Sequence, residues 1–148
     1  PRCTENRAVM AMIARGYLKL DPFEVWGDGE QIRNWTYVDD IVSGTIAAAE
    51  HITDGTSINL GTMERIKVKD CAQQVIDTLN PGASIKLLTD KPTGPLNRVA
   101  SNALAQQLLG WSPQTKFADG LQKTIDWYVN SKTTEQASAD LTRKLVGR

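Results

Sequence analysis

Residues 23–42, FEVWGDGEQIRNWTYVDDIV, contain the signals that decide the fold. Residues 23–26 are β-prone and predict a short strand. Residues 27–29, Gly-Asp-Gly, predict a tight turn, because glycine accepts positive φ and aspartate bonds its own backbone. Residues 35–38 are aromatic and β-branched and predict a second strand. The pair Asp39-Asp40 then predicts the N-cap of an apolar helix.

Arg33 lies between this turn and the second predicted strand, among largely uncharged neighbours. A guanidinium group matches a phosphate through two parallel hydrogen bonds. One arginine at the mouth of a strand pair is therefore a candidate anion clamp. Spacing alone leaves open the alternative that Arg33 is an ordinary surface residue on a hairpin.

The rest of the chain alternates helices with short strands, which indicates an α/β protein with a single domain. Apolar spacing of three and four residues predicts amphipathic helices, of which residues 40–51 are apolar enough to be largely buried. The expected helices are residues 5–20, 40–51, 68–79, 101–110 and 117–129, and further strands are expected at 57–60 and 84–88.

The composition excludes several classes of function. The 148 residues contain 17 basic and 17 acidic side chains, so the formal net charge is zero. A surface for nucleic acid or anionic membrane would need a basic excess, and no apolar run approaches a membrane span. Cys3 and Cys71 are too few and too far apart for a metal site. Cys71 falls on an apolar helix face, which predicts a buried thiol and fits a reducing, cytoplasmic location.

The run VWGDGEQIRNWTYVDD, residues 25–40, resembles the pattern YGDG-x-Q-x-RD-(aromatic)-x-YV-x-D of the extended short-chain dehydrogenase/reductase family. That family contains NAD-dependent nucleotide-sugar epimerases, dehydratases and decarboxylases. The likeness continues in INLG at 58–61 and LLGWSP at 108–113, and Pro1-Arg2 resembles the end of the family's YGPR segment. It covers roughly residues 1–130. Asn34 and Ser101 depart from it, because the family usually has aspartate at both positions.

The resemblance implies the C-terminal half of such an enzyme. The expected fold is a small α/β substrate-binding domain of short strands and packed helices, with the Rossmann half missing. We expect residues 1–132 to form the nucleotide-sugar-binding domain. Residues 133–148 turn polar and predict a tail with a marginal helix, which could fray or dock on a partner.

No cofactor-binding or catalytic residue is expected in this chain. Gly27 and Gly29 resemble the start of a dinucleotide fingerprint, but Arg33 follows where a third glycine and a helix would be required. In the family, that fingerprint and a catalytic Tyr-x-x-x-Lys pair lie upstream, so NAD is expected in the full-length enzyme. Tyr128 and Lys132 have the same spacing but come in the wrong order, and we expect an amphipathic tyrosine with a solvated lysine.

The resemblance assigns seven residues to substrate binding. At the phosphate end, Arg33 matches the family's pyrophosphate-binding arginine and Arg98 resembles a second arginine. Asn59 matches a position that contacts the phosphates or the neighbouring sugar, although a strand-end turn former is the alternative. At the base end the matching residues are Glu5, Asn6, Glu24 and Trp26, which could instead be a helix start and core residues.

We therefore expect this chain to be the nucleotide-sugar-binding part of an NAD-dependent epimerase/dehydratase. Its expected ligand is a nucleoside diphosphate sugar. Its expected protein partner is either the missing Rossmann half or a second copy of the chain. No nucleic acid or membrane partner is expected. The alternatives are a free-standing, non-catalytic binding or assembly module, and an incompletely folded half that packs only against its missing partner domain.

Overall fold

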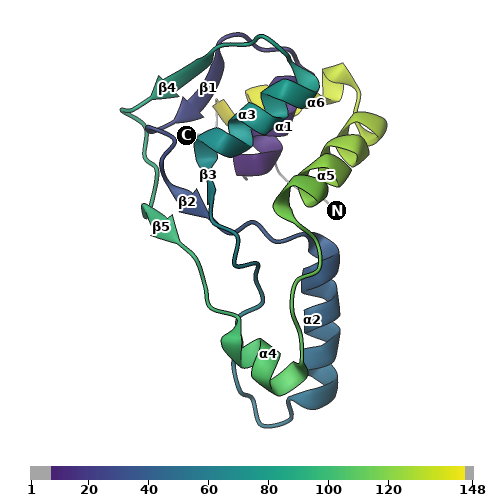
Figure 1. Cartoon of the computed structure of the whole chain (residues 1–148). Helices are drawn as coiled ribbons and strands as arrows, with labels where there is room; N and C mark the ends of the chain where they lie inside the picture. Colours follow the sequence, from purple (N-terminus) through teal and green to yellow (C-terminus); the bar gives the residue numbers. More distant parts are fainter. Residues whose placement is uncertain (1–7, 146–148) are drawn as a thin grey trace. The chain divides into compact units, whose positions relative to one another are not determined.

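The structure is a computed structural model that describes residues 8–145, and Figure 1 shows its helices and short strands. The predicted α/β class is confirmed. The elements in chain order are α1 (Ala8–Tyr17), β1 (Phe23–Trp26), β2 (Ile32–Arg33), α2 (Val38–His51), β3 (Ile66–Lys67), α3 (Val68–Leu79), β4 (Ile85–Leu88), β5 (Asn97–Arg98), α4 (Ala103–Leu109), α5 (Phe117–Ser131) and α6 (Thr134–Leu145).

The chain divides into two compact units. Unit 1 contains the described residues up to Glu30, then Lys67–Gly94, and the described residues from Thr124 onward. Unit 2 contains Gln31–Ile66 and Pro95–Lys123. Each unit is therefore built from segments that are distant in sequence.

Unit 1 packs α1, α3 and α6 with a parallel pair of strands, β1 and β4. The predicted apolar face of α3 is confirmed, because Val68, Cys71, Ala72, Val75 and Ile76 are buried and Leu79 is half-buried. Gly16 lets α1 approach α3 closely, since a Cβ atom there would lie 2.8 Å from Cγ1 of Val75. The predicted burial of Cys71 is also confirmed, and burial raises the pKa of its thiol to about 12. The largest fully buried side chains are Tyr128, Phe23, Ile13, Ile76, Val75 and Cys71.

Helix α6 packs against α1 in unit 1 and buries Ala137 completely. Its start carries a capping box: the backbone N–H of Gln136 donates to the hydroxyl of Thr133, and the N–H of Thr133 donates to the amide oxygen of Gln136. Lys132 also forms an ion pair with Asp140 at 2.9 Å. These contacts explain why this polar segment is helical, whereas the division of the chain at residue 132 stays a prediction.

The predicted second strand at residues 35–38 is wrong. The strand is Ile32–Arg33, and α2 already begins at Val38. The aromatic residues between them pack instead of joining a sheet: Trp35 stacks on Phe117 with ring centroids 5.6 Å apart, and the Tyr37 ring lies under the ammonium of Lys123. Packing within unit 2 thus overrides their preference for strands.

The predicted N-cap at Asp39-Asp40 is also wrong. The N-cap residue of α2 is Tyr37, and both aspartates lie in the first helical turn. Asp39 is exposed, whereas Asp40 is buried, and its two carboxylate oxygens accept the backbone N–H groups of Gln114 and Thr115. Asp40 therefore binds the loop at residues 114–115, which is distant in sequence but lies in the same unit, and it does not cap its own helix.

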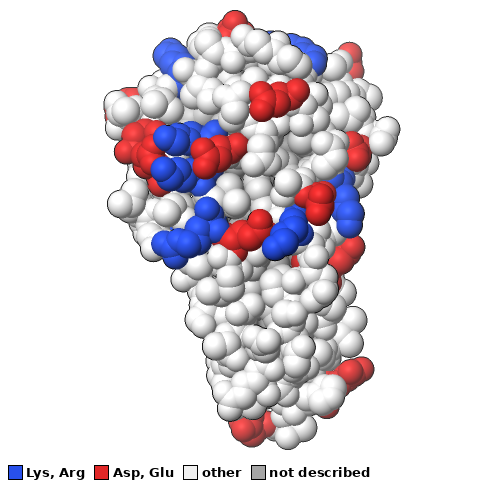
Figure 2. Space-filling model, viewed as in Figure 1, with Lys and Arg blue, Asp and Glu red and all other residues white. Residues whose placement is uncertain are grey.

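Helix α2 is far more exposed than predicted. Its buried residues are Asp40 and Gly44, and Gly44 packs against Leu60 and Trp111. Three aliphatic side chains at four-residue spacing form an exposed stripe, with exposed fractions of 60%, 49% and 54% for Val38, Val42 and Ile46 respectively. Figure 2 shows a surface with few charges over α2 and α4. We call Val38, Val42 and Ile46 the α2 stripe.

Candidate functional site

The parallel strands β2 and β5 bring together two of the predicted site residues. In their register Ile32 lies opposite Asn97, and Arg33 lies opposite Arg98. Neighbouring strands are about 4.8 Å apart. Two guanidinium-bearing residues from distant parts of the sequence therefore occupy adjacent positions in unit 2.

The electrostatics of this pair favour an anion. Like charges on directly opposed strand residues repel each other, and an anion that bridges them removes that cost. Arg33 is half-buried, and its Nη1 donates to the carbonyl oxygens of Ile32 at 2.7 Å and Pro95 at 2.9 Å. Arg98 is exposed. One guanidinium group is thus anchored beside β5, and the other can reach a ligand from solvent.

Asn59 is exposed and lies in residues 57–60, where the predicted strand is not formed. The backbone just after it is tightly held. The N–H of Thr62 donates to the hydroxyl of Thr36 at 3.0 Å, and the amide nitrogen of Asn34 donates to the carbonyl of Thr62 at 3.1 Å. The amide nitrogen of Asn102 donates to the carbonyl of Gly61 at 3.2 Å. The sequence interpretation did not assign Asn34, Thr36 or Asn102 to the site.

The residues predicted at the base end lie in unit 1 or outside the described residues. Glu24 and Trp26 alternate along β1 with buried Phe23 and Val25, so both project from the other face of the strand. Glu24 faces Lys86 on β4 at 3.7 Å. Glu5 and Asn6 are not among the described residues.

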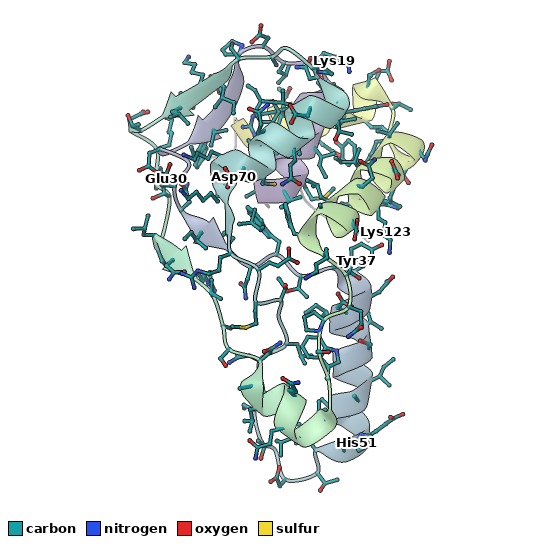
Figure 3. The ribbon with its side chains drawn as sticks, in the orientation of Figure 1. Lys19, Glu30, Tyr37, His51, Asp70 and Lys123 are labelled. Atoms are coloured by element: carbon teal, nitrogen blue, oxygen red, sulfur yellow. The ribbon has the colours of Figure 1, made fainter. Side chains whose placement is uncertain are left out.

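The glycine turn after β1 packs against residues at the start of α3. Gly27 and Gly29 both have positive φ, as a tight turn requires. A Cβ atom on Gly29 would lie 2.7 Å from Cβ of Lys69, so glycine allows this turn to pack closely against Lys69. Glu30, which Figure 3 labels together with Asp70 near the start of α3, binds the ammonium groups of Lys67 and Lys69. These ion pairs lower the pKa of Glu30 to about 2. These glycines serve turn formation and packing.

Tyr128 and Lys132 are both occupied in the packing of unit 1. Tyr128 is fully buried, and its ring meets that of Tyr17 edge-on at 5.7 Å. The backbone carbonyl of Lys132 accepts a hydrogen bond from the Tyr17 hydroxyl at 2.9 Å. Within residues 8–145 no group of three His, Cys, Asp or Glu side chains could hold a metal ion. No helix in this part of the chain has the length and apolarity that a bilayer crossing demands.

Comparison with known proteins decides the family. Residues 1–124 match the family described as GDP-mannose 4,6 dehydratase. The chain belongs to this family. The expected identity, the C-terminal part of an extended short-chain dehydrogenase/reductase, is thereby confirmed. The curated relatives that the chain matches include an epimerase, a decarboxylase and a dehydratase.

Two relatives illustrate the range of activities. GDP-mannose 3,5-epimerase 1 of Oryza sativa subsp. indica is 29% identical over 122 residues, which cover 82% of this chain and 32% of that protein. The dTDP-glucose 4,6-dehydratase of Escherichia coli is 31% identical over 128 residues, which cover 78% of this chain and 35% of that protein. The chain thus spans about a third of the length of these curated relatives.

The fold agrees with solved structures of the same group. UDP-glucuronic acid 4-epimerase from Bacillus cereus, crystallised with UDP-glucuronic acid and NAD, superposes with a TM-score of 0.76 at 30% identity. The match covers 86% of this chain and 41% of that enzyme.

Proposed function

We propose that this chain is the nucleotide-sugar-binding part of an NAD-dependent epimerase/dehydratase, and that Arg33 and Arg98 hold the diphosphate of the substrate. The parallel register that places these two arginines opposite each other carries the proposal. A diphosphate bears at least two negative charges, and two guanidinium groups match it in charge. Asn59 is proposed to contact the phosphates or the neighbouring sugar through its amide.

The role proposed for the chain is positioning and not bond-making. Holding the diphosphate fixes the sugar relative to reacting groups, which converts a random encounter into an oriented one. NAD and the proton-transferring tyrosine are assigned to the remainder of a longer enzyme. Glu24, Trp26, Glu5 and Asn6 are proposed for the base, and the cytoplasm is the proposed location because a reducing compartment suits the buried thiol of Cys71.

The substitution Arg33→Ala tests the proposed phosphate contact. It is expected to weaken binding of UDP and GDP at least about tenfold, because a hydrogen bond to a charged group contributes roughly 1.5–3 kcal/mol. Arg33→Lys should restore only part of the affinity, since a point charge cannot reproduce the fork. Calorimetric titration of the full chain measures both effects, with uridine and guanosine as ligands that lack the diphosphate.

Lys116→Ala is the matched control for loss of one positive charge, because Lys116 is exposed and lies in the same unit. Arg15 would be a poor control, since it is half-buried on α1 and burial lowers its pKa. Equal losses from Arg33→Ala and Lys116→Ala would indicate general charge attraction and would refute the assigned contact.

The α2 stripe supports a second part of the proposal, which concerns the protein partner. Exposed apolar side chains at regular helical spacing mark a surface that another protein covers. On α4 in the same unit, Leu104 and Leu108 are 40% and 44% exposed, so the apolar surface is wider than one helix. We assign this surface to the remainder of a longer enzyme, and to a second copy when the chain is alone. A free-standing binding or assembly module would use the same surface.

Light scattering of the isolated chain is expected to give a dimer or larger species. Val42→Glu places a charge in the α2 stripe and should shift the mass toward the monomer, 16.3 kDa. Ser138→Glu, at an exposed position of α6, should leave the mass unchanged. A monomer at high concentration for the unaltered chain would contradict this expectation.

A further inference from the structure

We infer that Asn34 and Asn102 are positioning residues for the proposed diphosphate site. They fasten the segments that carry Arg33 and Arg98 to the backbone that follows Asn59. The inference rests on the proposed function, and it adds which hydrogen bonds hold the phosphate-binding side chains in position.

The backbone of Thr62 is buried and is bonded to the segment that follows β2. This residue is 5% exposed, so its N–H and C=O groups require partners inside the protein. Both partners come from the segment that follows β2: Thr36 accepts from the N–H, and Asn34 donates to the C=O. Asn34 is the residue directly after Arg33. The position of Arg33 is thereby tied to residue 62.

Asn102 is the N-cap residue of α4. Asparagine at an N-cap ordinarily bonds the first turn of its own helix. Here the side chain makes no cap bond and donates to the carbonyl of Gly61, 41 residues away in sequence. A hydrogen bond within α4 is thus replaced by one to Gly61, which links the segment after Arg98 to the backbone that follows Asn59.

Gly61 and Thr62 form the junction that the side chains of Asn34 and Asn102 reach. A Cβ atom on Gly61 would lie 3.2 Å from the amide nitrogen of Asn34, so glycine leaves room for that amide. Gly61 and Thr62 follow Asn59 by two and three residues. Three segments, each with one proposed phosphate-binding side chain, therefore meet at a single dipeptide. Such a junction fixes the spacing of binding groups before the ligand arrives, which is what preorganisation requires.

The experiment is calorimetric titration of the full chain with UDP and GDP. Asn34→Ala and Asn102→Ala are each expected to weaken binding about threefold to tenfold, the range for loss of one hydrogen bond that holds a binding group. Asn80→Ala is the matched control. Asn80 also donates its amide to a distant carbonyl, that of Leu20, but it does so in unit 1. Its loss should leave the affinity unchanged.

A double-mutant cycle separates positioning from general stability. If Asn34 acts through Arg33, Asn34→Ala should cost nothing further in an Arg33→Ala background. The inference would be overturned if the affinity losses of Asn34→Ala and Arg33→Ala were fully additive. It would also be overturned if folded Asn34→Ala and Asn102→Ala bound with wild-type affinity. In both cases a loss of affinity in Arg33→Ala would still uphold the proposed function. Wild-type affinity of Arg33→Ala itself would overturn both. If Asn34→Ala does not fold, the cycle of Asn102→Ala with Arg98→Ala decides the question.

Discussion

Replacing Asp40 with alanine is expected to lower the free energy of unfolding by about 3 kcal/mol, because two hydrogen bonds to a buried charged group are lost. The carboxylate accepts the backbone N–H groups of Gln114 and Thr115, both at 3.0 Å. The indole of Trp111 donates to the backbone carbonyl of Asp40, so the substitution leaves that bond in place. Urea denaturation followed by circular dichroism measures the change.

Asp39→Ala provides the control in the same helical turn. Asp39 carries the same charge but is exposed, so its loss removes only a favourable charge near the helix N-terminus, about 0.3–1 kcal/mol. If both variants lost the same stability, the effect would come from the helix terminus. The proposed role of Asp40 in holding residues 114–115 would then be wrong.

Tyr128→Ala is expected to cost about 4 kcal/mol, within the range for removing a large buried aromatic side chain. The ring is fully buried, contacts the edge of Tyr17 and lies where α5 packs into unit 1. Thermal and urea unfolding of the full chain measure the loss.

Trp127→Ala tests whether burial is the cause. Trp127 is the preceding residue on α5 and has a larger side chain, but it is 39% exposed. Its removal should cost less than that of Tyr128, because less apolar surface returns to water. A greater loss for Trp127→Ala would show that helix α5 is held by a different face.

Local sequence signals predict the elements whose partners are nearby. The three- and four-residue spacing in residues 68–79 identifies α3, and the β-prone run before Gly27 identifies β1. The start of α6 was also readable, since Thr133 and Gln136 have capping-box spacing. The polar composition of residues 133–148 predicts only a marginal helix, whereas this capping box fixes the start of α6.

Two of the errors share a physical cause, because each involves a partner far away in sequence. Asp40 has the residue type of an N-cap, and its actual hydrogen-bond donors lie more than 70 residues later. Trp35 has the composition of a strand, but Phe117 offers it a stacking partner. Helix α2 reads as a core helix, although the described part of the chain leaves its stripe exposed. Composition alone does not reveal such partners.

The candidate site was only partly predictable for the same reason. The resemblance singled out Arg33 and Arg98, but only the strand register places them opposite each other. Asn34 and Asn102 are ordinary turn and cap residues in sequence terms. Their hydrogen-bond acceptors are 28 and 41 residues away, so no local pattern marks them as parts of the site.

The parallel pairing of β2 with β5 also constrains when the arginine pair can exist. Parallel strands need a long crossover connection, and closing a long loop is entropically costly and slow. During synthesis, Arg33 leaves the ribosome well before Arg98, and no register forms until both strands are available. A nucleoside diphosphate that binds the pair would therefore recognise the finished fold and stabilise it by mass action, but it could not template the early stages of folding.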